Sequence, residues 1–149
     1  EKVIMAIGGK SYPATGSNGE GFELLQHTGH SVHPLNPALA PVETAGNIAQ
    51  RLQGLNLKNV KVTVWSNGKK TGEDFGEMLF THFGLSGPII LTLSRLIVTE
   101  LQKKNEIELS IDLKPALDEQ KLDNRLIRDL NGQGKKKVGN LFRNWLPAS

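Results

Sequence analysis

Residues 76–91 read GEMLFTHFGLSGPIIL, and this stretch decides the fold. Apolar and polar residues alternate over residues 78–83, which predicts a strand. The glycines that follow predict a tight turn. Ser86 can cap a helix and Pro88 suits its first residue, so we expect a helix to begin here.

Alternation on both sides of this stretch extends the prediction to a sheet. Residues 60–65 (VKVTVW) alternate and are β-branched, Asn67-Gly68 is a favoured hairpin turn, and residues 69–75 form the expected return strand. We expect a helix over residues 88–102 and another strand over 107–113. Short antiparallel strands in this order predict a small barrel or a strongly curved sheet.

The N-terminal third has a different pattern of apolar residues. Residues 3–7 (VIMAI) form a continuous apolar run, which indicates a strand buried on both faces of a parallel sheet. Such a strand needs neighbours, so we expect the chain to be an interior piece of a longer protein. A helix over residues 18–28, capped by Ser17, is expected next. Residues 39–42 favour a short strand.

The C-terminal residues predict an all-helical unit. Asp118 can cap a helix that runs through Asn131. Residues 138–146 carry a second apolar stripe at helical spacing. The run Lys135–Lys137 between them is either a solvated charge run or a phosphate contact.

Composition bounds the function classes. The chain has 149 residues, is 38% hydrophobic, carries a net charge of +3 and contains no cysteine. The absence of cysteine excludes disulfides, thiol catalysis and cysteine-ligated zinc, and it is consistent with a cytoplasmic protein. We expect no membrane partner, because no apolar run reaches spanning length and the N-terminus does not read as a signal peptide.

A glycine-rich segment, GGKSYPATGSNGEG at residues 8–21, joins the first apolar run to the first expected helix. Glycines allow positive φ and close approach of a ligand to the backbone, and helix N-termini attract anions. The spacing does not match the dinucleotide fingerprint G-x-G-x-x-G. The residues alone therefore leave two interpretations open, a structural turn or a cofactor contact.

Several ordered motifs together resemble one family, the aminoacetone-oxidase-like group of NAD(P)/FAD-dependent oxidoreductases. The resemblance covers essentially the whole chain. The motifs that carry it are Gly8-Gly9, Ser11-Tyr12-Pro13, Thr15-Gly16-Ser17, Gly19-Glu20-Gly21, Pro37-Ala38-Leu39-Ala40-Pro41 and residues 76–91.

The resemblance implies an α+β fold in three parts: a remnant of a Rossmann-like FAD domain (1–36), a small antiparallel barrel-like insert (37–115) and a helical subdomain (116–149). The insert would cover FAD and shape the site of a small-molecule substrate, with NAD(P)H as reductant. The family's N-terminal G-x-G-x-x-G segment is absent from this sequence. We therefore expect the fragment alone to be inactive, and the rest of the FAD domain to be its partner.

The resemblance implies that residues of the glycine-rich segment lie close to the cofactor. The residues are Gly8, Gly9, Ser11, Tyr12, Thr15, Gly16 and Ser17. On the substrate side the candidates are Thr81 and His82, and His82 is open to two interpretations: a residue that holds a turn, or an acid–base group that faces the substrate or the flavin.

Other candidate clusters have simpler interpretations. His27, His30 and His33 are three residues apart, but Gly29 and Pro34 interrupt any helix there, so we expect no metal site. We expect the acidic cluster Glu73, Asp74 and Glu77 to be hairpin surface, and the apolar set Met78, Phe80 and Phe83 to be barrel core rather than a flavin contact.

The competing class is a self-contained basic module that binds RNA or a protein partner. It predicts salt-sensitive RNA binding, although the sparse aromatic residues disfavour a nucleic-acid partner. The flavoprotein interpretation predicts instead an exposed apolar edge over residues 3–7.

Overall fold

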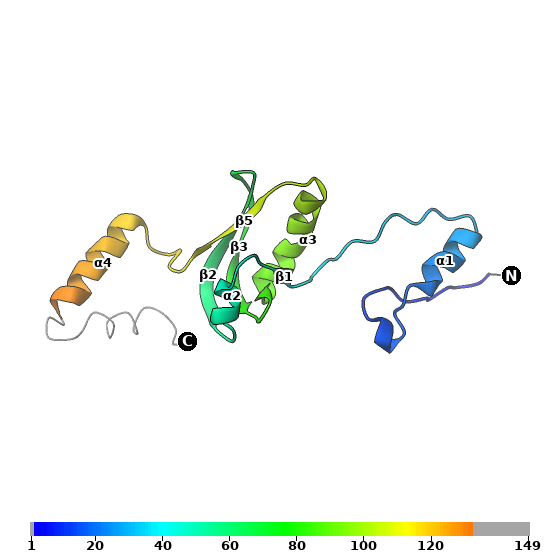
Figure 1. Ribbon diagram of the computed structural model, residues 1–149, viewed down its shortest axis with the longest axis horizontal. Coiled ribbons are helices and arrows are strands. Elements are labelled where there is room, and N and C mark those ends of the chain that lie inside the picture. Colours follow the sequence, from blue (N-terminus) through cyan, green and yellow to red (C-terminus); the bar gives the residue numbers. More distant parts are fainter. Residues whose placement is uncertain (1, 133–149) are drawn as a thin grey trace. The chain divides into compact units, whose positions relative to one another are not determined.

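The computed structural model describes residues 2–132, and the chain divides into two compact units between Asn36 and Pro37 (Figure 1). Each unit is described by itself. The expected second C-terminal helix (138–146) and the run Lys135–Lys137 lie outside the described residues.

Over residues 2–36 the first unit contains a 3₁₀ turn, η1 (Pro13–Thr15), and a helix, α1 (Glu20–His27). The helix was predicted, but its cap was not: Gly19 occupies the cap position and the Asn18 Oδ1 atom accepts a hydrogen bond from the Glu20 amide at 3.1 Å. Positive φ angles at Gly16 and Gly19 turn the chain away from Ser17, and the helix therefore begins later than the prediction.

The prediction of a strand over residues 3–7 is wrong. Within the described chain this segment joins no sheet, because a strand needs a hydrogen-bonded neighbour as well as β-branched residues. Val3 and Ile4 are 85% and 95% exposed, which confirms the expected exposure of apolar residues here, although they form no sheet edge. Ile7 differs: a Cβ at Gly21 would overlap its side chain, so Ile7 packs closely on α1.

The second unit is built on a curled antiparallel half-barrel sheet in the order β1-β4-β3-β2-β5, which confirms the expected α+β, barrel-like class. Its strands are β1 (Val42–Glu43), β2 (Asn56–Ser66), β3 (Lys69–Phe80), β4 (Gly84–Ser86) and β5 (Ile107–Asp112). Shifts of register along β2, between Leu57 and Val60 and between Val64 and Trp65, add the local twist that curls a sheet.

The hairpin of β2 and β3 forms as predicted, with positive φ at both Asn67 and Gly68. The strand expected over residues 78–83 is wrong in its bounds. Residues 78–80 are the end of β3, residues 81–83 form a turn, and β4 follows. The expected break between the strands 69–75 and 78–83 does not occur, because β3 continues through Gly76.

Both glycines of β3 instead make room for the long helix α3 (Pro88–Gln102). A Cβ at Gly72 would overlap the Leu96 side chain, and one at Gly76 would lie 2.9 Å from Ile89 Cγ2. The missing side chains therefore let α3 approach the strand backbone closely.

Helix α3 covers one face of the sheet and forms the core with it (Figure 1). Val62, Val64, Met78 and Ile90 are completely buried between the two. The bounds of α3 and its first residue, Pro88, were predicted, but Gly87 and not Ser86 is its cap residue. The expected core set is right for Met78 and Phe80, whereas Phe83 is exposed in the turn.

Two further helices complete the described chain. The short helix α2 (Ile48–Arg51) was not predicted and contributes Ala49 to the core. Helix α4 (Glu119–Asn131) begins where it was expected, because Asp118 Oδ1 accepts a hydrogen bond from the Lys121 amide at 2.8 Å. No helix within residues 2–132 is long and apolar enough to span a bilayer.

Candidate functional site

The glycine-rich loop of the first unit is ordered by one carbonyl. The Tyr12 carbonyl oxygen accepts hydrogen bonds from the Thr15 amide (3.0 Å), the Thr15 hydroxyl (3.0 Å) and the Ser17 amide (3.1 Å). Positive φ at Gly8 and Gly16 shapes the two ends of this loop. Tyr12, Thr15 and Ser17 therefore act first as turn-forming residues.

The backbone of this loop is accessible. A Cβ added at Gly8, Gly9 or Gly16 would meet nothing within 4 Å, so a flat ligand can approach the main chain there. Glu20 and Glu23 lie in the first turn of α1 and oppose an anion at that helix end. The loop thus leaves room for an uncharged ligand, and the two glutamates disfavour a pyrophosphate at this helix end.

The turn between β3 and β4 contains the two other candidates. The Thr81 hydroxyl accepts a hydrogen bond from the Gly84 amide at 3.1 Å and donates one to the Gly84 carbonyl at 3.0 Å. Thr81 therefore closes the turn. The exposed His82 ring packs edge-on against the Phe83 ring, with 4.8 Å between centroids, and is accessible to a proton-exchanging ligand.

The glycine-rich loop and the Thr81–His82 turn belong to different units. Within each group the candidates are brought together. Their roles as cofactor-binding and acid–base residues remain predictions.

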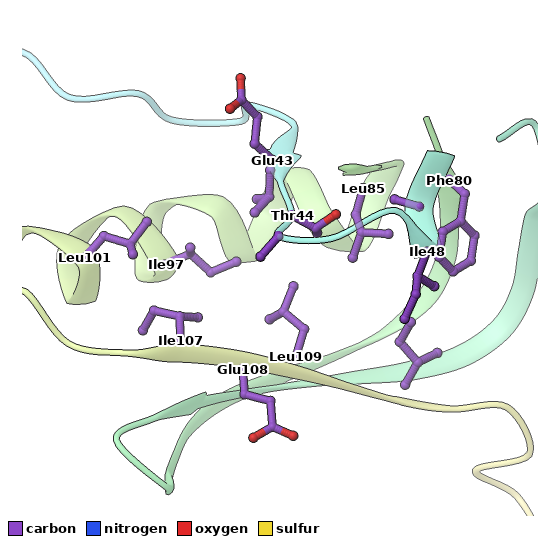
Figure 2. Close-up of a pocket in the computed structure, with 14 residues that line it drawn as sticks. Glu43, Thr44, Ile48, Phe80, Leu85, Ile97, Leu101, Ile107, Glu108 and Leu109 are labelled. Carbon is purple, nitrogen blue, oxygen red and sulfur yellow. The ribbon is translucent and has the colours of Figure 1, made fainter. Parts of the chain in front are cut away.

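The second unit also contains an apolar groove of about 510 Å³ that the sequence did not reveal. It lies along the open side of the half-barrel, between α3 and the edge strands β1 and β5 (Figure 2). The inward side chains of β5 form one wall, and Ile97 and Leu101 of α3 form the other. The alternation in residues 107–112 was the one available signal, because it places every second side chain on the inner face.

A polar cluster ties the C-terminal end of α3 to the hairpin. Glu100 is only 8% exposed, and its carboxylate accepts hydrogen bonds from Ser66 Oγ (2.7 Å), Asn105 Nδ2 (2.9 Å) and Lys103 Nζ (2.7 Å). The hydrogen bonds from Lys103, Ser66 and Asn105 lower the pKa of Glu100 from 4.5 to about 2. This carboxylate is a structural anchor and is already satisfied, so it is no candidate base.

The acidic cluster on β3 lies on the sheet surface, where it was expected. Glu73 pairs with Lys70 at 2.9 Å and with Lys61 at 3.9 Å, and the hydrogen bond from Lys70 lowers the pKa of Glu73. Glu77 pairs with Lys58 at 3.8 Å. Among residues 2–132 no three histidine or acidic side chains gather as a metal site.

Comparison with known proteins gives the family. Residues 36–149 match the HI0933-like protein barrel and H2TH domain. This match covers most of the chain, and the chain belongs to this family. It confirms, at the level of the family, the resemblance to flavoprotein oxidoreductases that the sequence motifs carried.

Two relatives have names that describe an activity. The chain is 30% identical over 118 residues to the 3-dehydro-bile acid delta(4,6)-reductase of Clostridium scindens, which is 79% of this chain and 29% of that protein. It is 34% identical over 95 residues to the ribosomal RNA dihydrouridine synthase of Escherichia coli, which is 63% of this chain and 23% of that protein. The chain thus spans less than a third of the length of these relatives.

Proposed function

We propose that this chain is part of a cytoplasmic, FAD-dependent oxidoreductase that takes electrons from NAD(P)H and reduces a small organic molecule. The observation that carries the proposal is the family match over residues 36–149. We further propose the division into a cofactor-domain part (1–36), a half-barrel that covers the flavin (37–115) and a helical part (116–149).

The names of the two relatives support reduction as the reaction. A reductase that acts at delta(4,6) positions and a synthase that makes dihydrouridine both describe the addition of hydrogen to a carbon–carbon double bond. We carry this reaction type to the present protein: two electrons and two protons are added to the substrate, and NAD(P)H is oxidised. A reduced flavin supplies hydride chemistry of this kind.

The chain's own residues contribute positioning. The open backbone at Gly8, Gly9 and Gly16 would contact an uncharged part of the cofactor, and Ser11, Tyr12, Thr15 and Ser17 keep the loop in shape beside it. The rest of the FAD domain would bind the pyrophosphate. We assign proton delivery to His82, and Thr81 fixes the turn that presents it.

The experiment is purification of the full-length protein followed by absorbance spectroscopy. We expect the absorbance bands of bound flavin, identification of the released cofactor as FAD, and bleaching of the bands when NADH or NADPH is added without oxygen. A full-length protein that neither retains flavin nor takes it up during reconstitution contradicts the proposal.

RNA is the alternative substrate class, because one relative is named for ribosomal RNA. On the surface of the sheet Lys58 and Lys61 of β2 and Lys70 of β3 pair with Glu73 and Glu77, so these lysines do not form a one-sided basic patch. We therefore favour a small molecule. Salt-dependent binding of the flavin-loaded protein to ribosomal RNA, with reduction of a uridine, would reverse this choice.

A further inference from the structure

The groove on the open side of the half-barrel is elongated. Figure 2 shows its side chains along α3 and β5, with Leu101 at one end and Ile48 at the other. These two end residues are 52% and 66% exposed, whereas Ile97, at 2%, lies deep between them. The side chains at the two ends are thus accessible, and Ile97 lies at the buried floor between them.

The groove wall is mostly apolar. Ile107 and Leu109 of β5 face Ile97 and Leu101 of α3 across it, and Ile111 also lines the groove. Its volume of about 510 Å³ lies in the range of roughly 300–1,000 Å³ that is typical of small-molecule sites. Such a wall stabilises a rigid apolar body, which loses little conformational entropy when it binds.

Polar contacts are available only along the borders of the groove. Within the described residues, β1 and β5 are the two edges of the sheet, and edge strands present backbone groups that lack a ladder partner. The Thr44 hydroxyl lies near the groove as well. These groups can hydrogen-bond an oxo or hydroxyl substituent at the margin of an otherwise apolar ligand.

Charge excludes one class of ligand. Glu43 and Glu108 flank the groove, and their carboxylates point away from it in Figure 2. Within residues 2–132, no lysine or arginine contributes to the lining. A carboxylate or phosphate in the groove would meet no cationic group among these lining residues and would have two acidic neighbours, so the groove would oppose an anion.

We propose that this groove binds the uncharged, fused-ring body of the substrate, with an oxo or hydroxyl group at the edge of β1 or β5. This inference rests on the proposed function, because it names the substrate class of the proposed oxidoreductase. It requires no residue of the glycine-rich loop.

The test measures binding and not turnover. Equilibrium dialysis of the oxidised full-length protein with tritiated progesterone, a neutral fused-ring ketone, is expected to show saturable binding. Leu101→Arg and Ile48→Arg should each weaken that binding by at least about tenfold, because each places a charge at a groove end. Phe75→Arg is the matched control, since Phe75 is 58% exposed on β3 and does not line the groove.

Four outcomes would overturn the inference. The first is no saturable progesterone binding. The second is equal loss of binding in Phe75→Arg. The third is equally tight binding of laurate, which is linear and anionic. If Leu101→Arg instead converts a dimer to a monomer in sedimentation without changing progesterone binding, the groove is an interface between copies and the inference also fails.

Folding and redox function are separated by two further measurements. Circular dichroism of each variant checks that it folds, and methyl resonances of Leu109 and Ile111 in the unmutated protein should shift when progesterone is added. If the protein contains flavin but does not bind progesterone, the proposed binding of substrate in the groove is refuted and the redox function is not. A protein that binds progesterone but holds no flavin refutes the redox function alone.

Discussion

The hydroxyl of Ser66 at the end of β2 donates a 2.7 Å hydrogen bond to the buried carboxylate of Glu100 in the last turn of α3. Asn105 donates to both of these groups and leads the chain into β5. Helix, hairpin and edge strand thus meet at one carboxylate. Because α3 and β5 are also the two long walls of the groove, this anchor holds the groove's shape.

The first prediction concerns pH. The pKa of Glu100 is lowered to about 2 in the folded protein from an ordinary value of 4.5. The charged form is therefore favoured by folding, and its contribution to stability is present above about pH 4.5 and lost as the pH falls towards 2. We expect the free energy of unfolding, from urea titrations, to fall more steeply over this window in the unmutated protein than in Glu100→Gln.

The control for this prediction is Glu108→Gln on the exposed face of β5. It should keep the acid dependence of the unmutated protein and its stability at neutral pH. Glu100→Gln should in contrast be less stable at neutral pH, because the amide cannot accept all three hydrogen bonds. Equal stability of the two variants at neutral pH would contradict the anchoring role of Glu100.

A second prediction concerns the contact between β1 and β4. A Cβ at Gly84 would overlap the Val42 carbonyl oxygen and lie 2.9 Å from the Glu43 Cα atom. Gly84→Ala should force β1 away from β4 and destabilise the protein by about 1–3 kcal/mol. Thermal unfolding measures the loss, with Gly9→Ala as control because Gly9 has open space around it. Equal stability of the two variants would show that β1 can move freely.

Local sequence signals were sufficient to predict the elements whose structure depends on neighbouring residues. The bounds of α3, the Asn67-Gly68 turn and the Asp118 cap were predicted because each depends on residues a few positions apart. The end of β3 was mispredicted for a non-local reason. The strand continues through Gly76, and the missing side chain there makes room for Ile89 of α3, thirteen positions later.

The same distinction applies to the candidate site. Glycine content and motif order indicated the loop at residues 8–17, because a loop of this kind is written in consecutive residues. The groove was not predicted, since its lining combines side chains from three separate parts of the chain: residues 42–49, residues 80–85 and residues 97–111. The Ser66–Glu100 contact was not predicted either, because a buried carboxylate cannot be identified from the sequence before its hydrogen-bond donors are known.

A third prediction distinguishes the structural role of Thr81 from the proposed catalytic role of His82. Thr81→Ala removes the acceptor of the buried Gly84 amide and should cost about 1–3 kcal/mol of stability, whereas Thr81→Ser should retain it. His82→Ala should leave the melting temperature unchanged, because the ring is exposed, but lower turnover and alter the pH profile of kcat/KM. An unchanged pH profile would assign His82 no part in proton transfer.

The last prediction concerns cofactor binding by the glycine-rich loop. Gly9 does not have a positive φ, and a Cβ there would meet nothing within 4 Å, so Gly9→Val should fold normally. The valine side chain would nevertheless occupy the space through which a flavin approaches the backbone. We expect the full-length Gly9→Val protein to contain less than about a tenth of the flavin of the unmutated protein, measured by absorbance after purification.

Gly132→Val is the matched control. Its Cβ would make only an ordinary contact, with the Arg128 carbonyl oxygen, and it lies at the end of α4. Equal flavin content in the two variants, with both folded, would exclude the loop from the cofactor site.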